Sequence, residues 1–122
     1  MGLDAYAEAE WDENQCDLEG DLKTLGLDEN LRLCEINVWK SVFKYCTCEG
    51  THAYLWTSVP KQKVRDWANT ARETADNVHP EFIIESSTKR FGKNNDATAA
   101  DVLKMCTYLQ TCAKYNASIR FC

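Results

Sequence analysis

The sequence lacks the features that define several well-known classes of protein. No apolar run approaches the roughly 20 residues that a membrane-spanning helix needs, and the start lacks the basic-then-apolar pattern of a secretory signal. We therefore expect a cytoplasmic protein that does not contact a membrane. The five glycines form neither a Gly-x-Gly-x-x-Gly nor a Gly-x-x-x-x-Gly-Lys motif. Chemistry on ATP or NAD is disfavoured for that reason.

Nothing in the sequence divides the chain into parts. It holds only two prolines and has no internal repeat, no low-complexity tract and no Pro/Gly-rich linker. Its 122 residues, 44% of them hydrophobic and 11% aromatic, suit a compact domain with one core. We predict a single domain over residues 1–122.

Charge is unevenly distributed along the chain. Residues 1–35 carry eleven acidic residues against Lys23 and Arg32, a net charge of −9, whereas residues 36–122 carry a net charge of +4. An acidic surface disfavours direct binding to nucleic acid, because that affinity comes largely from Lys and Arg. It favours a basic protein partner, although a charged face that only keeps the protein soluble is the simpler interpretation.

The opening segment, residues 3–11, alternates apolar and acidic residues. Ala5, Ala7 and Trp11 fall on the odd positions and Glu8 and Glu10 on the even ones. A strand separates these two kinds onto opposite faces, whereas a helix would scatter the acids around its circumference. We predict a strand with its carboxylates outward and its alanines and tryptophan inward. Residues 12–30 are predicted to form an excursion with at most a short helix.

The remainder alternates helical and strand patterns. Helices are predicted over residues 35–46, 61–78 and 99–115, and strands over residues 53–59, 82–84 and 119–122. Pro60 suits a first helical turn, the pair His79-Pro80 ends a helix, Asp96 or Thr98 caps the last helix, and Asn116 suits its stop. Residues 86–95 form the one clearly basic loop. The fold class predicted is α+β, with a sheet of about four strands and about three helices packed on it in two layers.

Seven cysteines are many for an intracellular chain of this size. They are Cys16, Cys34, Cys46, Cys48, Cys106, Cys112 and Cys122. A disulfide framework is disfavoured by the odd count and the absence of an export signal. A zinc site from Cys34, Cys46, Cys48 and His52 offers soft ligands, but Cys-x-Cys is not the usual spacing.

Two further interpretations of the cysteines remain. Cys46 or Cys48 can act as a nucleophile with His52 or His79 as base, because a thiolate needs a neighbour that lowers its pKa. Alternatively, cysteines serve as small buried apolar residues, which we favour for Cys34, Cys106 and Cys112. We expect no cofactor, with zinc as the alternative.

The first residues, Met1-Gly2-Leu3-Asp4-Ala5-Tyr6, resemble a group of small phage and bacterial proteins of unassigned function that begin Met-Gly-Leu-Asp-x-Tyr. The segments 35–39, 57–61 and 114–121 are similar to segments of the same group, although its terminal motif is not matched by Arg120-Phe121-Cys122. The resemblance implies a phage or mobile-element origin and carries no active site.

Function is weighed between a hydrolase and a binding protein. Runs of solvated acids usually have ordinary pKa values, whereas acid–base catalysis needs a desolvated carboxyl group. We therefore predict a non-enzymatic inhibitor of a host defence protein, of the anti-CRISPR or anti-restriction type, acting in the host cytoplasm on a basic or nucleic-acid-binding protein surface. The predicted contact residues are Glu8, Glu10, Trp11, Asp12, Glu13, Asp17, Glu19 and Asp21. Trp11 would be the buried anchor of the interface, unless it packs in the core.

Overall fold

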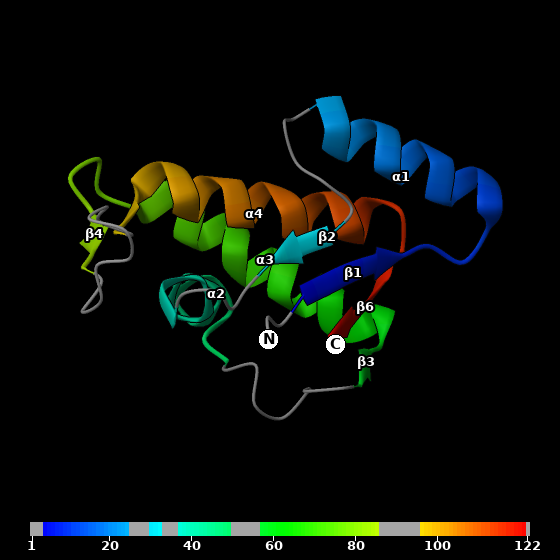
Figure 1. Ribbon diagram of the computed structural model, residues 1–122, viewed down its shortest axis with the longest axis horizontal. Coiled ribbons are helices and arrows are strands. Elements are labelled where there is room, and N and C mark those ends of the chain that lie inside the picture. Colours follow the sequence, from blue (N-terminus) through cyan, green and yellow to red (C-terminus); the bar gives the residue numbers. More distant parts are fainter. Residues whose placement is uncertain (1–3, 25–29, 33–36, 50–56, 86–95, 122) are drawn as a thin grey trace.

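A computed structural model of the chain describes residues 4–24, 30–32, 37–49, 57–85 and 96–121 (Figure 1). Within these residues there are four helices and six strands. In chain order the elements are β1 (Asp4–Glu8), α1 (Asp12–Thr24), β2 (Asn30–Arg32), α2 (Asn37–Thr47), β3 (Ser58–Val59), α3 (Lys61–Asn77), β4 (Ile83–Ile84), β5 (Ala97–Thr98), α4 (Ala99–Lys114) and β6 (Ser118–Phe121). The predicted α+β class is confirmed.

The main sheet has four strands in the order β2-β1-β6-β3, and each neighbouring pair is antiparallel. β1 and β6 are its central strands, with Ala5 opposite Phe121 and Ala7 opposite Ile119. The prediction placed β4 in this sheet, which is wrong: β4 pairs with β5 in a separate two-stranded sheet. The fourth strand of the main sheet is β2, which begins at Asn30, the last residue of the predicted excursion, and which the sequence analysis does not predict.

One face of the sheet packs on helices. Ala5, Ala7, Val59, Ile119 and Phe121 are all buried on that face. α3 and α4 run side by side and make the most extensive contact between helices, and α2 packs against both (Figure 1). α1 lies to one side of this group and contacts α4. The predicted two-layer arrangement therefore holds for three helices, and α1 is an addition to it.

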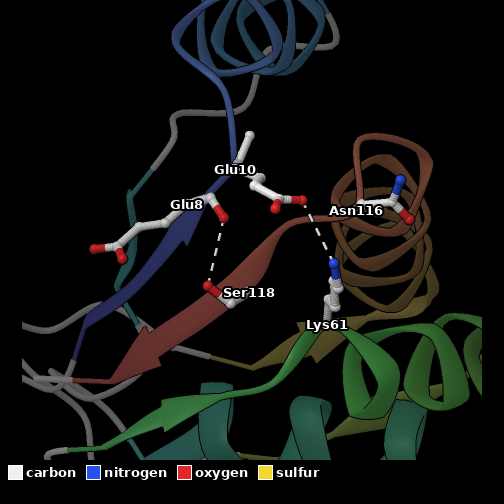
Figure 2. A pocket seen from close by; sticks show the side chains of 6 residues that line it. Glu8, Glu10, Lys61, Asn116 and Ser118 are labelled. Carbon is white, nitrogen blue, oxygen red and sulfur yellow. Dashed lines mark hydrogen bonds and ion pairs between the residues drawn. The ribbon is translucent and has the colours of Figure 1, made fainter.

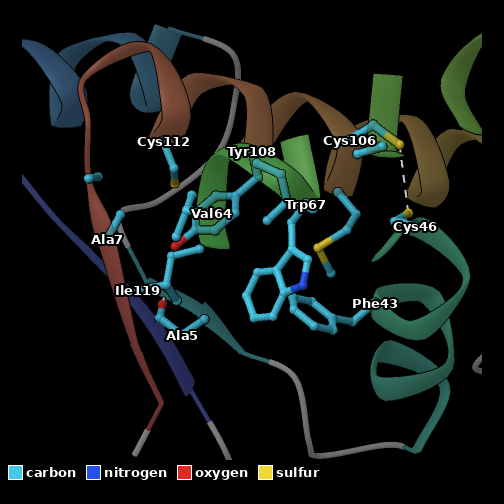
Figure 3. Close-up of a cluster of buried hydrophobic side chains, with 14 of the residues drawn as sticks. Ala5, Ala7, Phe43, Cys46, Val64, Trp67, Cys106, Tyr108, Cys112 and Ile119 are labelled. Carbon is cyan, nitrogen blue, oxygen red and sulfur yellow. Dashed lines mark hydrogen bonds between the residues drawn. The ribbon is translucent and has the colours of Figure 1, made fainter. Parts of the chain in front are cut away.

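Aromatic rings fill the centre of the core. Trp67 lies edge-on to Phe43 with ring centroids 5.0 Å apart (Figure 3). The ring centroids of Phe43 and Phe121 are 5.7 Å apart. The indole nitrogen of Trp67 donates a 2.9 Å hydrogen bond to Glu49, whose other carboxylate oxygen binds Lys63. The polar edge of the largest core side chain is thus satisfied, as burial requires.

The helix ends follow the predicted signals. Pro60 precedes α3 and accepts backbone hydrogen bonds from Lys63 and Val64. The carboxylate of Asp101 accepts a 2.8 Å hydrogen bond from the backbone of Thr98 at the start of α4. Asn116 follows α4 with φ of 51°, the left-handed conformation that Asn tolerates. The bounds of α3 and α4 therefore agree with the predicted helices 61–78 and 99–115 to within a residue or two.

Several predicted segments lie outside the described residues. They are the basic loop 86–95, residues 53–56 of a predicted strand, and residues 35–36 at a helix start. Across the part of the chain that the structure does describe, every helix is too short or too polar to cross a bilayer.

Candidate functional site

The acidic residues predicted to bind a partner are carried mainly by α1, which is longer than expected. The backbone N–H of Gln15 donates to the carbonyl oxygen of Trp11 at 2.8 Å and closes the first turn. Asp12 and Glu13 lie in that turn, where carboxylates interact favourably with the helix dipole. Thirteen residues of helix correct the prediction of an irregular excursion with at most a short helix.

α1 buries a narrow apolar stripe. Leu18 and Leu22, four positions apart, are fully buried and bring the helix against α4. Burial of each leucine contributes about 1.5–3 kcal/mol. Because Leu18 and Leu22 face the protein, the carboxylates of α1 lie on its other side or at the edge of its contact with α4.

The side chain of Gln15 joins α1 to the end of β1. Its Oε1 accepts a 2.6 Å hydrogen bond from the backbone of Ala9, and its Nε2 donates to the carbonyl oxygen of Ala7 at 3.2 Å. The same amide donates to Glu19 at 3.0 Å. The described pairing of β1 with β2 runs from Asp4 to Tyr6, and Gln15 binds the backbone of the residues that follow, at Ala7 and Ala9.

A second polar contact holds the far end of α1. Both Tyr115 and Lys114 donate to the carboxylate of Asp21, from the hydroxyl at 2.5 Å and from the ammonium at 3.2 Å. These hydrogen bonds hold the pKa of Asp21 below its usual value, and the hydrogen bond from Tyr115 has the largest effect. The same contact raises the pKa of Tyr115 and of Lys114. Asp21 therefore helps to hold α1 against α4. A partner could bind this carboxylate only by competing with the hydrogen bonds from Tyr115 and Lys114.

Three of the predicted contact carboxylates are presented to solvent. Asp12, Glu13 and Asp17 are exposed on α1, and no ion pair among the described residues involves them. From Glu8 to Asp21, both included, the sequence has seven acids and no base. Within the described part of the chain, the negative charge at these three positions of α1 is not compensated by an ion pair.

Glu8 and Glu10 are engaged within the protein. Glu8 binds Arg120 on the neighbouring strand β6 at 2.8 Å, and Glu10 binds Lys61 at the start of α3 at 3.4 Å. Both pairs lie near the surface, where such contacts contribute about 0–1 kcal/mol. The charges of Glu8 and Glu10 are therefore partly neutralised, and the part of the predicted acidic surface that follows β1 is carried by α1.

An open pocket of about 270 Å³ lies where these pairs meet. Its lining residues are Glu8, Ala9, Glu10, Lys61, Asn116 and Ser118 (Figure 2). The carboxylate of Glu10 points toward Lys61, whereas that of Glu8 points away from the pocket. Its main charged groups are thus already paired, and we assign it no ligand.

Trp11 is the prominent apolar residue of this region. The sequence pattern predicted that it faces inward, but its exposed fraction is 66%. The reason is that β1 ends at Glu8 and the chain turns into α1, so the alternation does not extend to position 11. The alternative of core packing is wrong. The Trp11 side chain is exposed to solvent, and its neighbours in the sequence are the acids Glu10, Asp12 and Glu13.

The cysteines that the structure describes do not form a cluster of metal ligands. Cys46 is buried, Cys48 is exposed with φ of 61°, and Cys34 and His52 lie outside the described residues. Among the described residues, no three His, Cys, Asp or Glu side chains come close enough to share a metal ion. The zinc and thiol alternatives centred on Cys46 and Cys48 stay predictions.

Two buried thiols meet in the core, which the sequence did not indicate. The Sγ of Cys106 donates to that of Cys46 at 3.6 Å, and Cys46 donates to the carbonyl oxygen of Val102 at 3.8 Å. Cys112 is also buried, which raises its pKa to about 12. The prediction that Cys106 and Cys112 are buried is confirmed.

Comparison with known proteins gives no relative. No family model matches the chain, and neither a curated protein nor a solved structure is found to match it.

Proposed function

We propose that this protein is a non-enzymatic binding module that docks α1 on a basic protein surface, with Trp11 as the anchor. The observation that carries the proposal is the 66% exposure of Trp11 directly before an acidic helix. A solvated tryptophan loses apolar hydration when a partner covers it, and tryptophan is enriched among the residues that dominate binding energy.

Charge supplies the direction of approach. Asp12, Glu13 and Asp17 are exposed on α1 with no base nearby in the sequence. Carboxylates arranged in this way attract a basic surface at long range and raise the association rate more than the affinity. A surface that binds nucleic acid has this basic character. The finer proposal is therefore inhibition of a nucleic-acid-binding host defence protein, of the anti-CRISPR or anti-restriction type.

Two sets of substitutions on different helices test the α1 surface. The first reverses the charges on α1 with Asp12→Lys, Glu13→Lys and Asp17→Lys. The matched control reverses the three exposed acids of α3 with Asp66→Lys, Glu73→Lys and Asp76→Lys. Both variants change the net charge by the same amount, so a difference between them reports the location of the charges. A neutral α1 variant, Asp12→Asn, Glu13→Gln and Asp17→Asn, separates the loss of charge from an unfavourable helix dipole.

The measurement is capture of a partner from bacterial lysate, followed by association kinetics with that purified partner. We expect a basic partner whose association slows at least tenfold with the α1 reversal and at higher salt, and changes little with the α3 control. Excess DNA or RNA should compete with it. Equal losses in the two reversed variants would show that only net charge matters and would contradict the proposal.

The defence-inhibitor proposal has its own test. Cells that express the chain should become permissive to a phage that their restriction or CRISPR system otherwise blocks, and the Trp11→Ala variant should restore the block. If capture depends on α1 but permissiveness does not change, the binding proposal stands and the inhibitor proposal falls.

A further inference from the structure

Cys46 of α2 and Cys106 of α4 lie in contact inside the core. Their sulfur atoms are 3.6 Å apart although the residues are separated by 60 positions (Figure 3). Both side chains are buried, at 0% and 1% exposed. A disulfide needs its sulfurs about 2.05 Å apart, so an approach of about 1.5 Å would join them.

We propose that Cys46 and Cys106 form a redox-active pair, which a peroxide converts into a disulfide that links α2 to α4. The pair is set apart from the other described cysteines by its geometry. Cys16 and Cys48 are exposed and Cys112 is buried, but no described sulfur lies in contact with any of these three. A single cysteine can only be oxidised or joined to another molecule, whereas two touching thiols can close a bond within the chain.

The oxidation proceeds in two balanced steps. In the first, the Cys106 thiolate attacks one oxygen of hydrogen peroxide, the O–O bond breaks, and the departing hydroxide takes up a proton to leave as water. In the second, Cys46 attacks the sulfur of the resulting sulfenic acid. The S–S bond forms, and the hydroxyl group leaves as a second water with the proton of Cys46. The two sulfurs lose two electrons, and one peroxide becomes two waters.

The contact itself favours Cys106 as the attacking sulfur. Once Cys106 loses its proton, the thiol of Cys46 can donate a hydrogen bond to the thiolate. That hydrogen bond lowers the pKa of Cys106, and the same interaction together with burial raises the pKa of Cys46. Because the pair is buried, we expect peroxide to react faster than a bulky oxidant such as glutathione disulfide.

The bond would constrain two helices that already touch. α2 and α4 pack against each other, and a link between positions 60 apart removes a large loop-closure entropy from the unfolded chain. We therefore expect the oxidised protein to melt about 5 °C or more above the reduced one.

The experiment uses the full chain with Cys16, Cys34, Cys48 and Cys122 replaced by serine, which leaves three thiols. The folded protein is treated with hydrogen peroxide, unfolded, and alkylated to count the thiols that remain. We expect one thiol to remain, at Cys112. Before alkylation, the mass of the oxidised protein should be lower than that of the reduced protein by two hydrogen atoms. Digestion should give a cross-linked pair of peptides that contain Cys46 and Cys106. Dithiothreitol should restore all three thiols.

Two variants of this background act as matched controls. Cys112→Ala should still form the disulfide, and Cys106→Ala should not. Peptide mapping of the oxidised native chain gives the same answer without any substitution, so a variant that fails to fold does not decide the outcome. The proposal is overturned if Cys46 and Cys106 stay reduced, if they gain oxygen without joining, or if either pairs with Cys112 instead.

Discussion

The hydroxyl of Tyr115 donates a 2.5 Å hydrogen bond to the carboxylate of Asp21, which lies 94 positions earlier in the sequence. This contact joins the last turn of α1 to the residue that follows α4. With Gln15 at the other end of the helix and Leu18 and Leu22 between them, it fixes the direction in which the acidic surface faces.

Asp21 gives the docking of α1 a defined dependence on pH. Its pKa in the folded protein lies below the usual 3.8, so its contribution is complete above about pH 5 and is lost as the pH falls through the folded-state value. The pKa values of Tyr115 and Lys114 are raised, so their part is complete below about pH 9 and is lost as the pH rises through their folded-state values. Hydrogen exchange of α1 amides, referenced to α3 in the same sample, should show lower protection at both extremes.

At neutral pH, the Asp21→Asn variant should show the same low protection of α1 amides that the unchanged protein shows at acidic pH. The reason is that the substitution removes the charge that Tyr115 and Lys114 bind. Asp17→Asn is the matched control, since Asp17 is exposed on the same helix. Equal protection of α1 in the two variants would rule out a role for Asp21 in docking.

Gln15 should matter to stability although it is a polar residue near the surface. Gln15→Ala leaves the backbone groups of Ala7 and Ala9 without their partner, and we expect a loss of about 1–3 kcal/mol in the free energy of unfolding by urea. Gln62→Ala on α3 is the control, with an expected loss below about 0.5 kcal/mol because Gln62 is exposed. Similar losses in the two variants would count against the bridging role.

Trp11 should affect binding without affecting stability. Since most of its surface is already in water, Trp11→Ala should change the free energy of unfolding by less than about 0.5 kcal/mol. Phe43→Ala, which empties part of the aromatic core, should cost about 3–5 kcal/mol. Urea unfolding measures both, and a large loss for Trp11→Ala would mean that this ring packs in the fold after all.

Asn116 should show the cost of its left-handed backbone. Asn116→Ala and Asn116→Gly both remove the amide that Arg65 binds, so their difference reports the backbone alone. With φ of 51°, the glycine variant should be more stable than the alanine variant by about 1 kcal/mol. Thermal unfolding of the pair measures this difference, and equal stability would argue against the left-handed conformation.

The parts of the fold that sequence reasoning recovered carry strong local signals. Ala5 and Ala7 alternate with polar neighbours in β1, and the apolar stripes of α3 and α4 repeat at helical spacing. Their ends are also marked locally, by Pro60 and by Asn116. Such signals reside in a few neighbouring residues, so no knowledge of the tertiary structure is needed to use them.

The parts that it missed depend on contacts between distant residues. α1 buries only Leu18 and Leu22, so its periodic signal is faint among acids and amides, although their four-residue spacing was a usable hint. The alternation predicts an inward Trp11 because no local residue indicates that β1 ends at Glu8. The contact of Cys46 with Cys106 arises only when α2 packs against α4.

The side chain of Gln15 also bears on whether β1 can pair with a strand of another molecule. Its side-chain amide accepts a hydrogen bond from the backbone N–H of Ala9 and donates one to the carbonyl oxygen of Ala7. Backbone groups of a strand that lack a partner are the groups to which strands from other molecules add. We therefore expect the residue that ties α1 to β1 also to make this strand less prone to pair with another copy of the chain.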